Sequence, residues 1–313
     1  MLLMASSVSA HSIKHIRDDS SGGDCTSIGT WTSSTKTCKL MTDLVNWTIQ
    51  IDDDGITFDG DRHKIIYNQD YHEFPNNVVI YLPNRQKVTI KNLDFEIKKS
   101  GYGIYLKEGF QNYLISNNVN KTSHDMTAFK LMNSTNNMLL GNRIISEGYG
   151  IELALSSDNN ILVNNKLIGY GGMDQSLTID GSKNIVISNY IMSNEPVYLL
   201  GSGNTVVNNV IKAQEKWGRK VTGDNNKIFH NDIEGPNEDV SDGGDNNQWF
   251  MNHYYNYDEP SEGCFDAYDN GICDSPLLIW RTMNNYDQFP LVSWYSLSAC
   301  LSSNIIFFTF LSH

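Results

Sequence analysis

Acidic side chains recur at one place in a repetitive stretch of this sequence, and two carboxyl groups at a fixed separation are what cleaves a glycosidic bond. When the short apolar strands of successive repeats are aligned, an acidic residue lies two to four positions upstream of four of them. If such strands stack, carboxylates one strand apart lie about 5 Å apart and those two strands apart about 10 Å, bracketing the separations in retaining and inverting glycosidases. The four residues are Asp125, Glu147, Asp174 and Glu195.

For an enzyme, the best acid/base pair is Glu147 and Glu195, with Asp125 and Asp174 as charge or cation partners. The same carboxylates would also suit Ca²⁺, which prefers oxygen ligands. The competing interpretation is a solvated polar turn, which we favour because the offset drifts and no arginine or lysine base aligns beside the carboxylates. Candidate substrate-binding side chains in the same stretch of the repeat are Tyr102, His124, Tyr149 and Trp217.

A second constellation lies near the C-terminus, in the segment from Asp266 to Asp274. Its candidate Ca²⁺ ligands follow calcium-loop spacing and are the side chains of Asp266, Asn270 and Asp274 with the backbone carbonyl of Ile272. Tyr268 occupies the third loop position and no glutamate occupies the twelfth. A turn closed by a disulfide, without metal, is therefore the favoured alternative, and Ca²⁺ remains the one cofactor considered.

The elements that position these residues follow from an internal repeat with the pattern apolar-x-Asn-x-apolar, in steps of 20 to 25 residues. Each unit holds runs of three to five alternating residues and no helical run, which predicts a single parallel β-helix of about eight to nine coils. We expect the asparagines to occupy left-handed tight turns and to hydrogen-bond as a stacked amide ladder. Asn92 and Gly60 extend the series upstream. The seven repeated residues are Asn117, Asn142, Asn165, Asn189, Asn209, Asn231 and Asn252.

The outward strand positions form a mixed column that suits a solvated face and weak glycan contact. Its members are Tyr105, Lys130, Glu152, Thr178, Tyr198 and Lys220.

The repeats, the phrase from Gly55 to Gly60 and the C-terminal segment 269–291 resemble the NosD-type right-handed β-helix proteins over about residues 50–292. That resemblance implies an all-β, right-handed solenoid of the carbohydrate-binding and sugar-hydrolase β-helix group. One turn departs from the family pattern, because Asp61 and Arg62 stand where Asn-Gly is usual. Copper gains no support, because the eight His and ten Met are dispersed without a recurring ligand spacing.

The segments on either side of the repeats complete the expected domain organisation. We expect a truncated signal-peptide remnant at 1–10, an N-terminal cap at 11–50, repeats at 51–252, an aromatic C-terminal cap at 253–292 and an apolar tail at 293–313. Disulfides are expected between Cys25 and Cys38 and between Cys264 and Cys273, which indicates an oxidising compartment. The predicted location is therefore secreted, periplasmic or at the cell surface.

The composition of the chain limits the classes of partner that it can bind. The chain has 36 asparagines and a net charge of −13, so a nucleic-acid partner is excluded. No internal stretch is apolar enough to span a membrane, and only the 293–313 tail offers membrane contact. The sequence thus predicts an exported, non-catalytic protein that binds or displays a polysaccharide or surface glycan. The alternative is a polysaccharide-active enzyme, either a glycosidase or a lyase.

Overall fold

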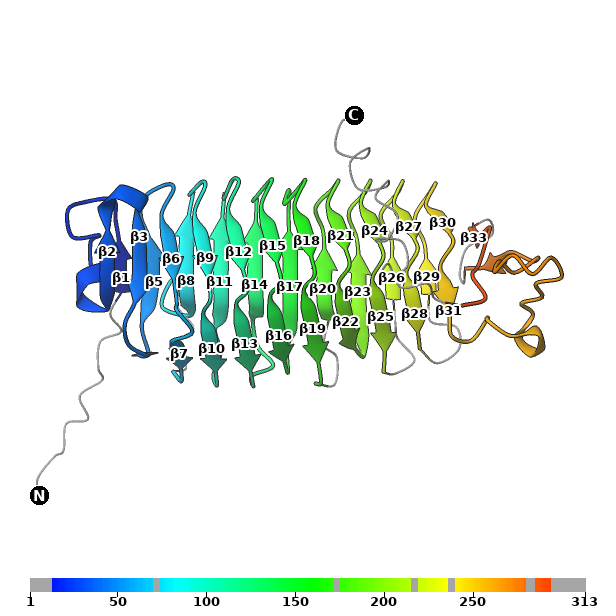
Figure 1. Cartoon of the computed structure of the whole chain (residues 1–313), viewed down its shortest axis with the longest axis horizontal. Helices are drawn as coiled ribbons and strands as arrows, with labels where there is room; N and C mark the ends of the chain where they lie inside the picture. Colours follow the sequence, from blue (N-terminus) through cyan, green and yellow to red (C-terminus); the bar gives the residue numbers. More distant parts are fainter. Residues whose placement is uncertain are drawn as a thin grey trace, which may run out of the picture.

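The protein is a parallel β-helix, as the sequence predicts (Figure 1). The computed structural model describes residues 13–69, 74–171, 175–214, 219–235, 240–279 and 285–293. The strands stack along the long axis, and each coil passes once through each of three sheets. The helical elements in these ranges are the 3₁₀ turns η1 (Cys25–Ser27), η2 (Ser33–Thr35) and η3 (Pro260–Glu262). No helix in the described ranges has the length and apolarity that a membrane crossing requires.

Sheets A, B and C are named here for the three sides of the coil, and neighbouring strands along each sheet come from consecutive coils. Sheet A contains, in order, β1 (Ile13–Ile16), β5 (Thr48–Ile51), β8 (Val78–Pro83), β11 (Tyr102–Lys107), β14 (Thr127–Met132), β17 (Tyr149–Ala154), β20 (Gln175–Ile179), β23 (Glu195–Leu199), β26 (Arg219–Val221) and β29 (Val240–Asp242).

Sheet B contains β2 (Gly29–Thr32), β3 (Thr37–Leu40), β6 (Thr57–Asp59), β9 (Thr89–Lys91), β12 (Tyr113–Ile115), β15 (Met138–Leu140), β18 (Ile161–Val163), β21 (Ile185–Ile187), β24 (Thr205–Val207), β27 (Lys227–Phe229), β30 (Gln248–Phe250), β33 (Tyr286–Asp287) and β32 (Leu277–Leu278). Sheet C contains β4 (Leu44–Val45), β7 (Lys64–Tyr67), β10 (Asp94–Ile97), β13 (Asn118–Lys121), β16 (Arg143–Ser146), β19 (Lys166–Gly169), β22 (Tyr190–Ser193), β25 (Val210–Ala213), β28 (Asp232–Glu234) and β31 (His253–Tyr254).

In the core, equivalent apolar residues of successive coils stack on one another in columns. In sheet B the central residue of each three-residue strand points inward and pairs with the central residue of the next coil, as Leu162 does with Leu139 and Val186. Each is almost completely buried. Burial of one such side chain stabilises the fold by about 1.5–3 kcal/mol, so short strands suffice when every coil repeats the contact.

The corner between sheets B and C carries the predicted asparagines as a buried amide ladder. The side-chain amide of each asparagine donates to the side-chain oxygen of the asparagine in the next coil, at 2.9 Å from Asn142 to Asn165 and 3.0 Å from Asn165 to Asn189. The same oxygen also accepts the backbone N–H of the preceding ladder residue. The described ladder runs from Asn117 to Asn252.

The prediction that the repeated asparagines occupy the left-handed turn position is wrong. It belongs to the residue before each ladder asparagine, such as Asn164 at φ 53° or Asn208 at φ 65°. The ladder residue itself points inward to satisfy buried backbone groups. Asn92, at φ 55°, likewise occupies the left-handed position, and the buried Leu93 takes the ladder place in that coil. The ladder therefore does not extend to Asn92.

A second asparagine ladder, absent from the sequence analysis, lines the corner between sheets A and B. Its members lie five residues before those of the first ladder, and a typical step is 3.0 Å from Asn137 to Asn160. The fixed offset of five is visible in the sequence, so the repeat contained this signal. Its residues are Asn112, Asn137, Asn160, Asn184, Asn204, Asn226 and Asn247.

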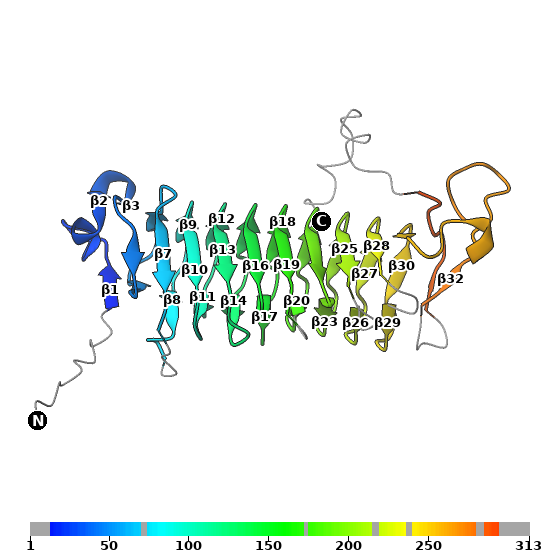
Figure 2. The ribbon, with the colours of Figure 1, turned by 90° about the horizontal axis from the view of Figure 1, so that it is seen from below.

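Different structures cover the two ends, which Figure 2 shows at opposite ends of the long axis. At the N-terminal end β2 and β3 form an antiparallel hairpin, and β3 then pairs in parallel with β6. Parallel pairing therefore begins before residue 51. The predicted disulfides are confirmed, with Cys25 bonded to Cys38 and Cys264 to Cys273.

Candidate functional site

The outer face of sheet A presents two rows of aligned side chains across consecutive coils. The first row is the mixed column expected from the sequence, now extended by Tyr81, which pairs with Tyr105. The second row lies three residues earlier in each strand and holds Tyr102, Thr127, Tyr149, Gln175 and Glu195. The spacing is three rather than two because two adjacent residues point inward between the rows, such as Ala128 and Phe129.

Aromatic rings occupy the end of this face nearest the N-terminal cap. Tyr102 lies 5.3 Å from Tyr105 between ring centroids, and Phe74 packs edge-on against Tyr81 at 4.8 Å. Burial, with smaller effects from neighbouring tyrosines, raises the pKa of Tyr105 to about 12. Tyr81 and Tyr105 are mostly packed against their neighbours, whereas Phe74 is about half exposed. The accessible part of the cluster is therefore Phe74 and the edge of Tyr102.

A charged network follows on β14 and β17. Lys130 Nζ lies 3.0 and 2.9 Å from the two oxygens of Glu152, and the hydroxyl of Thr127 donates to Glu152 at 2.9 Å. The Lys130 ammonium also lies 5.8 Å from the Tyr102 ring centroid. These contacts hold the lysine and the carboxylate flat on the sheet, where each keeps some exposure to solvent.

A second polar network lies on β20 and β23, beyond Tyr149. Thr178 donates to Gln175 at 2.8 Å, and Gln175 donates to Glu195 at 3.4 Å. Burial, together with the adjacent charge of Glu195 and a hydrogen bond to it, raises the pKa of Tyr198 to about 12. Tyr149 stands between the two networks with 43% of its surface exposed. The face thus alternates exposed aromatic surface with fixed hydrogen-bonding groups.

The predicted carboxylates are not in one register. Glu195 is the first residue of β23 and shares its row with Tyr149, whereas Glu147 precedes Tyr149 by two residues in the turn before β17. Glu147 instead meets His124, whose Nε2 lies 3.9 Å from the carboxylate and whose Nδ1 lies 3.0 Å from the Glu147 carbonyl. Asp125 is exposed, and its carbonyl oxygen accepts from Lys121. Asp174 and Trp217 lie outside the described residues.

Across the described ranges, no three side chains of His, Cys, Asp or Glu converge as a metal site. In the C-terminal loop, Asp266 accepts the backbone N–H groups of Asn270 and Gly271 at 3.0 and 2.8 Å. Asp274 accepts from Ala267 at 2.8 Å, and Asn270 accepts from Ile272 at 3.0 Å. The side-chain oxygens proposed as Ca²⁺ ligands therefore stabilise the loop backbone in this arrangement.

The three parallel sheets and the paired corner ladders define the class of protein as a β-solenoid with a polar, partly aromatic outer face. The chain matches the family of right-handed β-helix regions over residues 48–211, and it belongs to that family. This match supports the predicted right-handed solenoid. No curated protein matches the chain.

Proposed function

We propose that this protein is an exported, non-catalytic β-helix protein that binds a polysaccharide along the outer face of sheet A. The observation that supports it is the pair of rows of side chains on this face, of which the first runs from β8 to β26 and the second from β11 to β23. Seven neighbouring strands span six steps of about 4.8 Å, roughly 29 Å in total, which suits an extended polymer better than a small molecule.

The chemistry of the rows fits sugar rings. An exposed tyrosine such as Tyr149 offers an apolar ring face with a hydroxyl at its edge, which suits a ligand with both C–H and O–H groups. Fixed donors and acceptors flank it on both sides, at Lys130 with Glu152 and at Gln175 with Glu195. Because these groups already orient one another, little side-chain conformational entropy is lost when a ligand binds to them.

Export is part of the same proposal. The two disulfides support it, because such bonds persist in oxidising compartments and are uncommon in reducing ones. The N-terminal residues considered as a signal remnant, 1–10, lie outside the described residues, as does most of the 293–313 tail.

A glycan array with the purified full chain tests the binding proposal. We expect binding to a subset of polysaccharides, and Tyr149→Ala should weaken it roughly tenfold because one stacking surface is lost. Tyr113→Ala is the matched control, because Tyr113 is 39% exposed but lies on sheet B. Equal weakening by both variants, or no glycan binding by the wild type, would contradict the proposal.

A reducing-sugar release assay on the same glycans, with and without Ca²⁺, separates the enzyme alternative. We expect no release. Release that is lost in Glu147→Gln and Glu195→Gln would establish the glycosidase or lyase and replace the non-catalytic proposal.

A further inference from the structure

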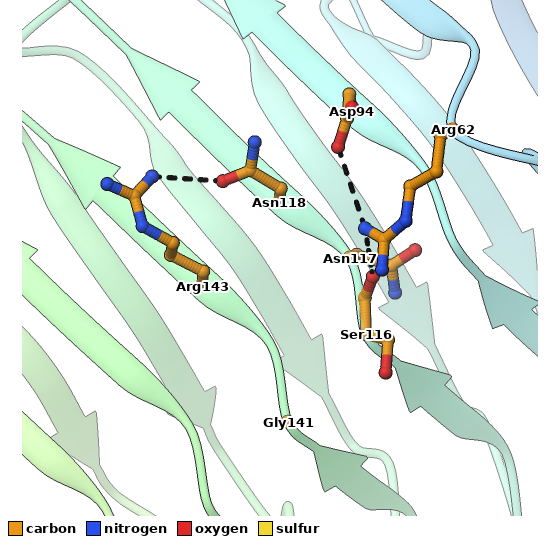
Figure 3. Close-up of a pocket in the computed structure, with 7 residues that line it drawn as sticks. All are labelled: Arg62, Asp94, Ser116, Asn117, Asn118, Gly141 and Arg143. Carbon is orange, nitrogen blue, oxygen red and sulfur yellow. Dashed lines mark hydrogen bonds and ion pairs between the residues drawn. The ribbon is translucent and has the colours of Figure 1, made fainter.

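A hollow of about 440 Å³ lies where sheets B and C meet, away from the rows of sheet A. Figure 3 shows two arginines in it, on either side of Asn118. The lining residues are Arg62, Asp94, Ser116, Asn117, Asn118, Gly141 and Arg143.

Few contacts on the protein hold the two guanidinium groups, two at Arg62 and one at Arg143. Arg62 donates to the Ser116 carbonyl at 3.0 Å and lies 3.7 Å from the Asp94 carboxylate (Figure 3). Arg143 donates to the Asn118 side chain at 3.0 Å. A guanidinium has five N–H donors, so most donors of each arginine stay available to a ligand.

The local backbone opens this hollow. Ser116, Gly141 and Asn164 occupy the same left-handed position in consecutive coils, and only Gly141 among these three lacks a side chain. Asp61 and Arg62 are both left-handed, at φ 47° and 67°, and form the turn from which the Arg62 side chain reaches the hollow. This is the same turn at which the sequence departs from the Asn-Gly of the β-helix proteins it resembles.

Positive charge continues beyond the hollow along the outer face of sheet C. Lys166 pairs in register with Arg143, and its ammonium lies 5.3 Å from the Tyr190 ring centroid on the next strand. Among the described residues no acidic side chain pairs with Arg143 or Lys166. In a chain of net charge −13, these residues form a local cationic row.

Three acidic residues on the Arg62 turn and on β10 already pair with cations. Asp94 pairs with Arg62, Asp61 lies 2.9 Å from Lys39, and Glu96 lies 3.0 Å from Lys98. The row of Arg62, Arg143 and Lys166 therefore keeps a net positive charge.

The extent of the cationic row favours a polymer over a free ion. The Arg62 and Arg143 side chains approach the same coil, where they donate to the Ser116 carbonyl and the Asn118 side chain. Lys166 lies one strand beyond Arg143, a step of about 4.8 Å. A small anion can engage the arginines alone, whereas a chain bearing several anionic groups can engage them and Lys166 together.

We propose that the hollow and the adjoining cationic row bind the carboxylate or sulfate groups of an acidic polysaccharide. Arg62 and Arg143 supply paired N–H donors to the planar or tetrahedral anion, which is the geometry in which guanidinium groups bind most strongly. Tyr190 lies beside Lys166, whose ammonium is over its ring. The site is separate from sheet A, so it does not depend on the binding proposed there.

The test is titration calorimetry of the full chain with a polyuronate, a sulfated glycan, a neutral glycan and single-stranded DNA. We expect the acidic glycans to bind and the neutral glycan not to bind, with affinity falling as salt is raised. Arg62→Gln and Arg143→Gln should each weaken binding roughly tenfold.

Two further variants separate this site from nonspecific charge attraction. Gly141→Asn places a side chain in the hollow without changing charge, and Asn tolerates the left-handed position as Asn164 does, so we expect it to weaken binding as well. Lys183→Gln, combined with Lys227→Gln, removes two cations elsewhere on the surface and should leave affinity unchanged; Gln111 already occupies the left-handed position equivalent to Lys183.

Equal loss in the Lys183/Lys227 variant would overturn the proposal, as would tighter binding of single-stranded DNA than of either acidic glycan. Absence of acidic-glycan binding would do the same. A loss in Tyr149→Ala alone, with the arginine variants unaffected, would place binding on sheet A and also reject this site.

Discussion

Asn252 donates two hydrogen bonds to one oxygen of Asp287, from its side-chain amide at 2.9 Å and from its backbone N–H at 3.1 Å. The amide ladder of the sheet B/C corner therefore ends on a carboxylate. Tyr254 donates a third hydrogen bond to that oxygen at 3.1 Å. Burial of the Asp287 carboxyl raises its pKa although these donors oppose the shift.

The raised pKa of Asp287 predicts a specific pH dependence of stability. A carboxyl whose pKa is higher in the folded state contributes stability that is fully present below its unfolded pKa, about 4, and is lost as the pH rises through the folded pKa. The free energy of unfolding of the wild type, minus that of Asp287→Asn, should thus be larger at about pH 4 than at about pH 7. Urea unfolding at both pH values measures it, and a difference that grows with pH would contradict the assignment.

His253 predicts a second pH effect at the C-terminal end. Burial lowers the pKa of His253, but the Asp232 contact at 2.7 Å and the Asp258 contact at 3.2 Å outweigh burial and raise it. Its contribution to stability is fully present below about pH 6.5, the unfolded value, and is lost as the pH rises through the folded pKa. Thermal unfolding of wild type and His253→Gln should therefore differ more at acidic than at alkaline pH. A constant difference across this range would show that the imidazole does not titrate in this way.

Loss of one ladder amide should lower the free energy of unfolding markedly. Asn165→Ala removes the acceptor of two hydrogen bonds from Asn142 and the donor to the Leu139 carbonyl. Leaving these buried groups unpaired should cost about 3 kcal/mol. The neighbouring Asn164→Gly is the control, since this exposed residue sits at φ 53° and glycine adopts that conformation freely, so we expect less than about 0.5 kcal/mol. Equal effects in urea unfolding would show that the buried position is not special.

The disulfide between Cys25 and Cys38 should stabilise the N-terminal coils. It closes a segment with a sequence separation of 13, and removing such a cross-link costs about 3 kcal/mol. Cys25→Ala combined with Cys38→Ala should lower the urea midpoint accordingly, because β3, which contains Cys38, pairs directly with β6. An unchanged midpoint would mean that the hairpin holds without the cross-link.

The fold could be predicted because the residues that specify it recur at regular intervals in the sequence. Inward apolar residues and corner asparagines recur in every coil, and Leu139, Asn142 and Asn165 follow a rule that the sequence displays directly. The second ladder could have been found from the offset of five between Asn137 and Asn142. The left-handed positions could not be assigned from residue type alone, since serine, glycine and histidine occupy them as well as asparagine.

The candidate site was less predictable because coil lengths vary at the turn between sheets C and A. An offset that varies from two to four residues along the chain does not fix a register between strands. Glu147 lies four residues before its aligned strand residue and Glu195 only two, so they occupy different rows. The hollow at Arg62 and Arg143 depends on contacts between coils that are 81 residues apart in sequence, and the repeat pattern gives no signal for such a pair.

The aspartates at the ends of the two ladders also bear on polymer growth. Stacked strands that repeat every 4.8 Å are the template on which fibrils extend. The second ladder also ends at a carboxylate, but within its own coil, where Asn247 donates to the buried Asp242 at 2.8 Å and Trp249 donates to the other carboxylate oxygen at 2.7 Å. A carboxylate has no hydrogen to pass on. A molecule that stacked on this end would find both ladders ended by carboxylates, so Asp287 and Asp242 limit the number of coils that the amide ladders can extend through.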